Sequence, residues 1–301
     1  MIDLLNLRLS RRKAMALGLA TSTGFSVAAL AASIKDAAGF DETVKDPQRI
    51  VSIGNAVTEI VFALGMKDKV IAVDTTSKGV PGAETLPDVG YMRALAAEGI
   101  LAQAPDLILA TLDSGPKEVI ETLRQSKVPV AQLPIEASVA GIIKKIEMAG
   151  ALLGKTTEAK VLIAKTQGQA DALKQMVAAL PKKPKTLFVL SLAGGKITAG
   201  GAHSSAGAIL DLVGADNVAA SMNGYQAISP EILTLTPPDA IVMMATGPTE
   251  GLAEKVKADP VLSTTPAAKT GAIYTVDGAA LLGFGTRSLD AASALAKQLH
   301  G

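Results

Sequence analysis

The chain has 301 residues, of which 49% are hydrophobic, so it is long enough for one large or two ordinary domains with sizeable cores. A formal net charge of +1 and an aromatic content of only 3% argue against nucleic acid as a partner. The absence of cysteine excludes disulfides, thiolate metal sites and a cysteine nucleophile, and it predicts a mature N-terminus without a cysteine-linked lipid anchor.

Residues 1–38 have the features of an export signal. Arg11 and Arg12 precede a mildly apolar stretch that ends in small residues, and the arginine pair resembles a twin-arginine signal. A membrane anchor is the alternative, but glycine, serine and threonine interrupt the stretch, which is too polar for a span of about 20 apolar residues. We therefore expect residues 1–38 to be cleaved on export and to lie outside the fold.

Residues 39–154 alternate short apolar runs with helical patterns. Strands are expected at residues 49–53, 70–73, 107–110 and 128–131, and helices at 58–64, 95–101, 117–125 and 139–153. Short links join these segments. The alternation predicts an α/β lobe with a mainly parallel sheet.

Residues 155–181 differ from the rest, because they contain a long stretch without proline that ends at Pro181. We expect one helix there, linking two globular halves. In residues 182–301 the pattern resumes, with strands at 186–190, 240–244 and 272–276, helices at 206–213, from 230 and at 288–300, and glycine-rich loops at 193–205 and 281–286. The sequence thus predicts an α/β protein of two lobes, each with a mainly parallel sheet flanked by helices, and a ligand cleft between them.

Tyr91 is the first candidate binding residue. It lies in a glycine-containing loop after a polar segment, and Arg93 follows two residues later. A phenol titrates near pH ~10, so a bound cation and a neighbouring guanidinium would help it to ionise. Tyrosine is also one of the axial ligands of haem iron. The alternative is a loop tyrosine that rests on the surface.

Two further side chains lie on the glycine-rich loops of the second half. His203 follows Gly200-Gly201-Ala202 and could ligate a metal, although an exposed histidine before a helix is the alternative. Arg287 follows residues 283–286 and could pair with a carboxylate of a ligand, or it could be an ordinary surface arginine.

Two acids occupy comparable places in the two halves. Glu59 is in the first turns of a helix, and Glu231 begins a helix after Ser229-Pro230. We expect both to be exposed on one outer surface, where they could dock to cationic residues of a partner. The alternative is a pair of acids that interact favourably with helix dipoles.

Motifs of catalysis are missing from the chain. Residues 193–196 (AGGK) lack the spacing of a phosphate-binding loop, and there is neither a dinucleotide fingerprint nor a nucleophile elbow. An α/β enzyme that uses a nucleotide cofactor therefore remains only as an alternative, and the sequence favours a binding protein.

These segments together resemble a known family. The chain is similar to the periplasmic haem-binding proteins of ABC-type haem importers, within the helix-linked class of substrate-binding proteins that also serves siderophores and cobalamin. The general features of the class are residues 49–52, 58–60, 156–180 and 229–231. Residues 87–93 (PDVGYMR) and 282–287 (LGFGTR) are the features that resemble haem binders in particular.

The resemblance implies a role for each matching residue. Tyr91 corresponds to the axial ligand of ferric haem iron, and Arg93 to an arginine beside it. Glu59 and Glu231 correspond to acids that contact arginines of the permease, and His203 falls where some relatives supply a second ligand.

The same resemblance implies the cargo and partners. The chain would be a periplasmic monomer that receives haem downstream of an outer-membrane receptor and delivers it to an ABC permease with its ATPase. The rival expectation is a carrier of a ferric siderophore or a corrinoid on the same scaffold.

Overall fold

The computed structural model describes residues 32–245 and 251–301. Most of the expected export signal thus lies outside the described residues. Among the described residues, no helix has both the length and the apolar character that crossing a membrane requires.

An antiparallel hairpin opens the described chain, formed by β1 (Ala32–Lys35) and β2 (Asp41–Val44). Asp36, which is buried, accepts a hydrogen bond from Arg124 at 2.7 Å, and Glu42 accepts another at 2.5 Å. The same guanidinium lies 3.9 Å from the centroid of the Phe40 ring. Residues 32–38 therefore belong to the folded protein, and the expectation that the fold begins only after residue 38 is wrong.

The N-terminal lobe contains a four-stranded parallel sheet in the order β4-β3-β5-β6. Its strands are β3 (Ile50–Ile53), β4 (Val70–Val73), β5 (Leu107–Thr111) and β6 (Val130–Leu133). Strand side chains point alternately to the two faces, so that Leu107 and Leu109 join one core and Ile108 joins the other. Because both faces are buried, the strands are apolar throughout, as parallel strands usually are.

Helices cover both faces of this sheet. One face packs against α1 (Asn55–Ala63) and α4 (Val139–Leu152), and the other against α2 (Ala97–Leu101) and α3 (Lys117–Gln125). Two 3₁₀ turns, η1 (Lys67–Lys69) and η2 (Thr75–Gly79), flank β4. The order of the strands reverses beside β3, and ligands of open α/β sheets bind outside the carboxyl ends of strands at such a point.

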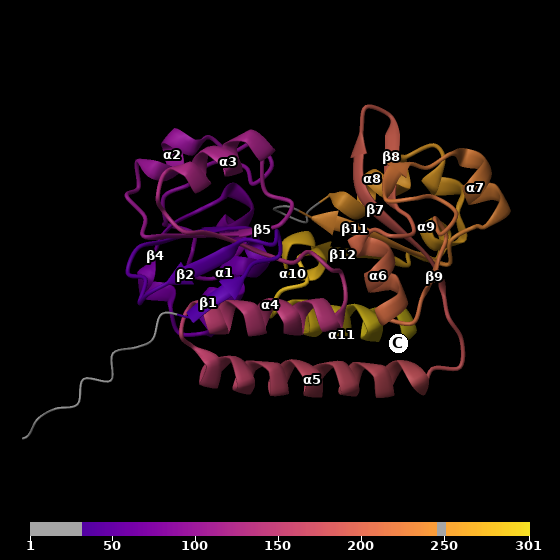
Figure 1. Cartoon of the computed structure of the whole chain (residues 1–301). Coiled ribbons are helices and arrows are strands. Elements are labelled where there is room, and N and C mark those ends of the chain that lie inside the picture. The colour runs from indigo at the N-terminus through magenta and orange to yellow at the C-terminus, as the bar shows by residue number, and fades with distance from the viewer. Residues whose placement is uncertain (1–31, 246–250) are drawn as a thin grey trace, which may run out of the picture. The chain divides into compact units, whose positions relative to one another are not determined.

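Helix α5 (Thr156–Ala178) follows α4 and leads to the second sheet. Its 23 residues span about 34 Å, and it packs along both α4 and α11 (Ser288–His300), as Figure 1 shows. One continuous core includes residues of α1, α4, α5 and α11.

The second sheet has six strands and is mixed rather than mainly parallel. Its strands are β7 (Lys185–Ala193), β8 (Lys196–Gly200), β9 (Asp216–Asn217), β10 (Tyr225–Ala227), β11 (Ala240–Ala245) and β12 (Ile273–Asp277). β9, β11 and β12 run parallel to their neighbours, whereas β8 pairs antiparallel with both β7 and β10.

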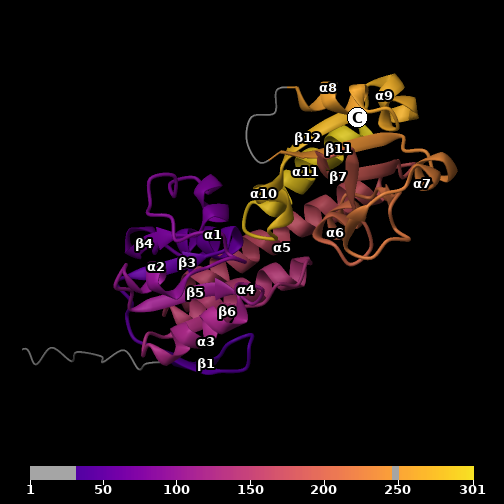
Figure 2. The same ribbon diagram turned by 90° about the horizontal axis from the view of Figure 1, so that it is seen from above.

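The helices of this lobe are α6 (Ser205–Leu212), α7 (Pro230–Leu235), α8 (Leu252–Ala258), α9 (Pro266–Thr270) and α10 (Gly278–Leu282), with the 3₁₀ turn η3 (Leu262–Thr264). α8 and α9 cover the face that carries Leu187 and Ile241, and α6 and α11 cover the face that carries Phe188 and Val242 (Figure 2). The predicted two-lobe α/β fold is thus confirmed, with one mixed sheet.

Candidate functional site

The loop that carries Tyr91 is fastened to β4 by backbone hydrogen bonds. Val73 donates to the carbonyl of Pro87 at 2.9 Å and accepts from Val89 at 2.9 Å, and Thr75 donates to the carbonyl of Gly90 at 3.0 Å. The loop therefore continues the edge of the sheet instead of lying free in solvent.

Side chains fix the direction in which the loop presents Tyr91. Val89 and Met92 are buried in the core under α2 and α3, and Tyr91 between them is 45% exposed. Gly90 has a φ of 99°, in the left-handed region that favours glycine. Its N–H donates to the side chain of Asp88 at 2.8 Å, which closes a turn. Anchored neighbours thus hold the phenol outward.

Arg93 connects the phenol to a carboxylate. Its Nη1 donates to the Tyr91 Oη at 3.1 Å, and its Nη2 forms a close ion pair with Asp113. Burial alone would lower the pKa of Arg93, but the hydrogen bond to Tyr91 and the charge of Asp113 outweigh it, and the pKa is raised. The guanidinium therefore stays charged and supplies a charge-assisted donor to the phenol oxygen.

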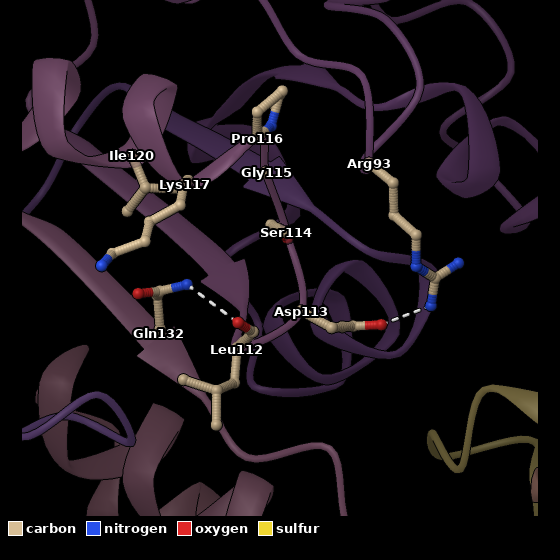
Figure 3. Close-up of a pocket in the computed structure, with 9 residues that line it drawn as sticks. All are labelled: Arg93, Leu112, Asp113, Ser114, Gly115, Pro116, Lys117, Ile120 and Gln132. Carbon is tan, nitrogen blue, oxygen red and sulfur yellow. Dashed lines mark hydrogen bonds and ion pairs between the residues drawn. The ribbon is translucent and has the colours of Figure 1, made fainter.

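Next to this triad, the loop after β5 shapes a surface pocket of about 460 Å³. In Figure 3 the Arg93 side chain reaches Asp113 at one side of the pocket, and Gln132 donates to the carbonyl of Leu112 at 3.3 Å. The other lining residues are Ser114, Gly115, Pro116, Lys117 and Ile120. The pocket thus combines cationic, acidic and apolar groups.

Apolar side chains stand exposed along the same edge of the N-terminal sheet. Leu112 follows β5, Ile135 follows β6, and both are exposed, as Tyr91 is. The carboxyl ends of parallel strands meet at one edge, so these side chains share it with Tyr91. Exposed apolar groups grouped in this way indicate a surface that a partly apolar ligand can cover.

Arg287 does not lie free for a ligand, in contrast to our expectation. Its Nε donates to Glu59 Oε1 at 2.8 Å, and its backbone N–H donates to Glu59 Oε2 at 3.1 Å. Nη1 lies 3.6 Å from Asp277, and Nη2 is buried without a hydrogen-bond partner among the described residues. The guanidinium is thus occupied by an internal carboxylate.

The expectation that Glu59 is exposed is therefore wrong. The residue is 4% exposed, because the connection from α10 to α11 covers it. A Cβ on Gly285 would lie 2.4 Å from Glu59 Oε2, and one on Gly283 would lie 2.5 Å from Asn55 Nδ2. Glycine at both positions lets this connection approach α1.

A buried lysine adjoins the covered carboxylate. Lys145 on α4 is 2% exposed, and its Nζ lies 3.4 Å from the carbonyl oxygen of Gly283. Burial lowers its pKa to about 8, while the charges of Glu59, Asp113 and Glu136 oppose the shift. The α10–α11 connection thus rests on a polar cluster, which we call the Glu59 cluster: Asn55, Glu59, Lys145 and Arg287.

Glu231 is exposed in the first turn of α7, as expected. Hydrogen bonds from the Ser229 side chain and its own backbone N–H lower its pKa. Pro230 occupies the first helical position, also as predicted. Glu231 is therefore a charged carboxylate open to solvent.

His203 is exposed just before α6, with a φ of 56°. The cap of α6 is Ser204, whose hydroxyl accepts from Gly207 at 2.9 Å. No group of three or more histidine, cysteine, aspartate or glutamate side chains that could hold a metal ion occurs within residues 32–245 and 251–301. His203 thus remains a solvent-facing imidazole outside any such cluster.

Two residues that sequence reasoning did not single out belong to this description. Asp113 pairs with Arg93. Its position two residues after the carboxyl end of β5 is the sequence feature that could have identified it. Tyr225 opens β10, and its hydroxyl accepts from the backbone of Ala206 at 3.1 Å. Only the paired register of β8 and β10 brings Tyr225 beside α6, so no local pattern could reveal it.

Several solved structures similar to this chain are those of haem-binding proteins. The periplasmic heme-binding protein HutB of Vibrio cholerae is 34% identical, with a TM-score of 0.76 over 84% of this chain and 99% of that one. The periplasmic heme-binding protein BhuT, in complex with two hemes, is 30% identical, with a TM-score of 0.78 over 84% of this chain and 97% of that one.

Curated relatives include differently named proteins. An uncharacterized ABC transporter substrate-binding lipoprotein, YvrC of Bacillus subtilis, is 27% identical over 89% of this chain and 85% of its own length. The vitamin B12-binding protein of Pectobacterium carotovorum is 37% identical, over only 29% of this chain and 32% of its own length. The names of the similar proteins thus divide between haem and vitamin B12.

The family itself is unambiguous. The model of the family described as "Periplasmic binding protein" matches residues 50–280, which include both sheets and α5. The family and the similar structures are solute-binding proteins. This chain therefore belongs to the periplasmic binding protein family, as a substrate-binding protein of the class that serves haem, vitamin B12 and siderophores.

Proposed function

We propose that this protein captures ferric haem in the periplasm and delivers it to an ABC-type importer. The observation that carries the proposal is the exposed Tyr91 phenol, hydrogen-bonded to Arg93 at the carboxyl edge of the N-terminal sheet. Similar structures of haem-binding proteins, at 30% and 34% identity, support the same ligand. No chemistry on the cargo is required, so the protein acts as a carrier and not as an enzyme.

The chemistry of capture follows from the phenol. Ferric iron is a hard cation that replaces the phenol proton, and Tyr91 then serves as an anionic axial ligand. Arg93 Nη1 already donates to this oxygen, so it stabilises the negative charge that develops on ligation. Exposed Leu112 and Ile135 offer apolar contacts to the face or edge of the macrocycle.

A single anionic oxygen ligand suits a carrier. It favours ferric over ferrous iron, as expected in an oxidising compartment. Ligation through one side chain of a loop binds the cargo and still permits its transfer. His203 is the candidate for a second ligand, and it would act in this way only if it approaches the bound iron.

A corrinoid carrier is the second candidate, because curated relatives are named vitamin B12-binding or cobalamin-binding proteins. Cobalamin carries its own lower ligand and has no free propionates. A corrinoid therefore needs neither a phenolate as metal ligand nor a guanidinium to bind a propionate. The pair of Tyr91 and Arg93 favours haem over this alternative.

The partners follow from the proposed transport role. Glu231 is charged and exposed, so it can meet a cationic residue of the ABC permease, which its ATPase drives. Glu59 could do so only after leaving Arg287. We expect a periplasmic monomer without a lipid anchor, although the relative YvrC is a lipoprotein, and an outer-membrane receptor upstream.

Ligand titration tests the proposal directly. Purified protein is titrated with hemin and, separately, with cyanocobalamin, and both are followed by absorption and by displacement of one ligand by the other. Saturable hemin binding that cyanocobalamin does not displace supports the proposal. Saturable cyanocobalamin binding with no spectral change on hemin addition would assign the protein to corrinoid transport instead.

Docking is tested in the same system. Transport of hemin by cells that carry Glu231→Gln should fall, while the hemin affinity of the purified variant stays that of the wild type. Uptake at the wild-type rate would remove Glu231 from the docking surface.

A further inference from the structure

Asp74 is a fully buried carboxylate that has no part in ligation of the cargo. It follows directly after β4, the strand to which the loop of Tyr91 is fastened. Within residues 32–245 and 251–301, no cationic side chain forms an ion pair with it. A buried carboxyl group is costly unless hydrogen bonds compensate for the lost water, so its partners must supply them.

Four donors converge on the carboxylate of Asp74. Oδ1 accepts from the backbone N–H of Gly54, at the start of α1, at 2.7 Å and from the hydroxyl of Ser77 at 2.5 Å. Oδ2 accepts from the backbone N–H and the hydroxyl of Thr76, at 2.9 Å and 2.5 Å. Ser77 itself accepts from Thr58 at 3.0 Å, which leaves the Ser77 proton for Asp74. Asp74 therefore joins the start of α1 to the turn η2.

The first residue of η2 holds the loop that presents Tyr91. Thr75 donates its backbone N–H to the carbonyl of Gly90 at 3.0 Å and its hydroxyl to Asp88 Oδ1 at 3.1 Å. The same Asp88 oxygen accepts from the N–H of Gly90 and closes the turn before Tyr91. One threonine of η2 thus contacts both residues that define this turn.

The next residue of η2 contacts the other side of Tyr91. The Thr76 hydroxyl, which donates to Asp74, also lies 3.9 Å from Sδ of the buried Met92. Tyr91 is exposed, so the direction of its phenol depends on the backbone on both sides of it. The contacts of η2 hold that backbone, and Asp74 holds η2.

We propose that Asp74 is a positioning residue for the ligand site, which fixes η2 and thereby the loop that directs the Tyr91 phenol at the cargo. This inference rests on the proposed function, and it assigns a residue that acts without touching the ligand. A metal ligand on a loop that is already ordered loses less conformational freedom on binding, which increases affinity. Groups that orient a metal ligand in this way typically contribute about 10- to 100-fold to affinity.

Hydrogen exchange in the ligand-free protein tests whether Asp74 holds the loop. The N–H of Val89 donates to the carbonyl of Val73 and makes no contact with Asp74, so its exchange rate reports whether the loop stays on β4. Asp74→Asn places an amide NH₂ where two donors point. Exchange in peptides that contain Val89, followed by mass spectrometry, should become about tenfold faster.

Asp36→Asn is the matched control. Asp36 is also buried in the N-terminal lobe and accepts from the backbone N–H groups of Ala38, Phe40 and Gln132, but it has no hydrogen bond to η2 or to the loop of Tyr91. This variant makes the same chemical change at a comparable site. It should leave exchange at Val89 and the hemin affinity at their wild-type values.

Hemin titration tests the consequence for binding. Asp74→Asn should weaken hemin binding about tenfold and keep the phenolate-to-iron band at saturation, because Tyr91 remains the ligand. If Asp74→Asn does not fold, Thr76→Val replaces it. Valine keeps the shape of threonine and removes the hydroxyl that contacts Asp74 and Met92, so the same two changes are expected.

The outcomes distinguish this inference from the proposed function. Unchanged exchange at Val89 in Asp74→Asn, or equal changes in Asp74→Asn and Asp36→Asn, overturns the positioning role. Faster exchange with unchanged hemin affinity also overturns it. Absence of hemin binding by the wild type refutes the haem function instead, and titration of the same variants with cyanocobalamin then decides the role of Asp74 by the same criteria.

Discussion

Two arginines that look alike in the sequence have opposite surroundings in the structure. Arg93 and Arg287 each follow a glycine-containing loop, and both were candidates for binding a ligand. Arg93 lies at the exposed edge of the N-terminal sheet and donates to a phenol that faces solvent. Arg287 is bound to a carboxylate with 2% side-chain exposure, 228 residues away in sequence.

The difference shows what leaves an arginine side chain free to contact a ligand. Arg93 pairs with Asp113 through one nitrogen and keeps another on the oxygen of Tyr91, so its charge reaches the surface. Arg287 forms an ion pair with Glu59, and among the described residues Glu59 has no other ion pair. Availability thus depends on whether the partner carboxylate is buried, and a local sequence pattern does not contain that information.

The largest expected effect concerns stability. Arg287→Ala leaves Glu59 buried without its counter-ion, which should lower the free energy of unfolding by about 2 to 3 kcal/mol, below the full cost of a buried pair because the Arg287 side chain is 28% exposed. Arg93→Ala, at a side chain that is 55% exposed, should cost less than about 1 kcal/mol. Urea unfolding of both variants measures the difference, and equal losses would contradict the contrast.

Lys145, which adjoins the buried Glu59, should make the free energy of unfolding depend on pH. The pKa of Lys145 is about 8 in the folded protein and 10.5 for a solvated lysine, as in the unfolded chain, so between these values the unfolded state binds more protons. Its contribution to the free energy of unfolding therefore rises as the pH rises from about 8 to 10.5. Lys145→Met should remove that rise and stabilise the protein at pH 7 by about 2 kcal/mol.

Other groups also titrate at alkaline pH, so the measured quantity is the difference in unfolding free energy between wild type and variant at each pH. Lys144→Met on the same helix is the matched control and should leave the pH profile unchanged. A Lys145→Met difference that does not vary with pH would mean that Lys145 is not desolvated as described.

A smaller effect concerns ligand binding at the exposed arginine. Arg93→Ala should weaken hemin binding by about tenfold, since the phenolate loses one charge-assisted hydrogen bond. Arg93→Lys should recover part of the loss, because it keeps the charge without the planar fork. A folded Arg287→Ala protein should bind hemin as the wild type does, and hemin affinity that falls more with Arg287→Ala than with Arg93→Ala would reverse the comparison.

Asp113→Asn should produce the smallest change. It removes the ion pair at Arg93 but keeps a hydrogen-bonding side chain, and about a two- to threefold change in hemin affinity is expected. Isothermal titration at low and high salt checks it, because screening should shrink the difference. A loss greater than that of Arg93→Ala would show that Asp113 acts other than through Arg93.

Much of the fold could be predicted, because it depends on local patterns. The apolar runs and helix signals located α3 and α11 at their observed bounds, and the long proline-free stretch located α5. We predicted a loop at residues 193–205 and missed strand β8 within it. Gly194 and Gly195 both have positive φ and form the turn of the β7–β8 hairpin. An antiparallel partner after a glycine pair was the overlooked signal.

The site was less predictable, since its residues meet through tertiary contacts. Tyr91 and Arg93 are two residues apart, so the sequence alone could suggest them, and the structure joins them by a hydrogen bond. Glu59 near a helix start was expected in solvent, and only the return of the chain near Gly285 covers it. The buried Asp36 was assigned to the export signal because small residues surround it in the sequence.

The most direct test of the account is a hemin titration of Tyr91→Phe beside the wild type, followed by absorption. Tyr274→Phe is the control, because it loses a phenol on β12 of the second sheet. The account predicts saturable binding with a phenolate-to-iron band for the wild type and for Tyr274→Phe. For Tyr91→Phe it predicts that the band is lost and that binding is at least about tenfold weaker. An unchanged band and affinity in Tyr91→Phe would contradict the role of Tyr91 as the iron ligand.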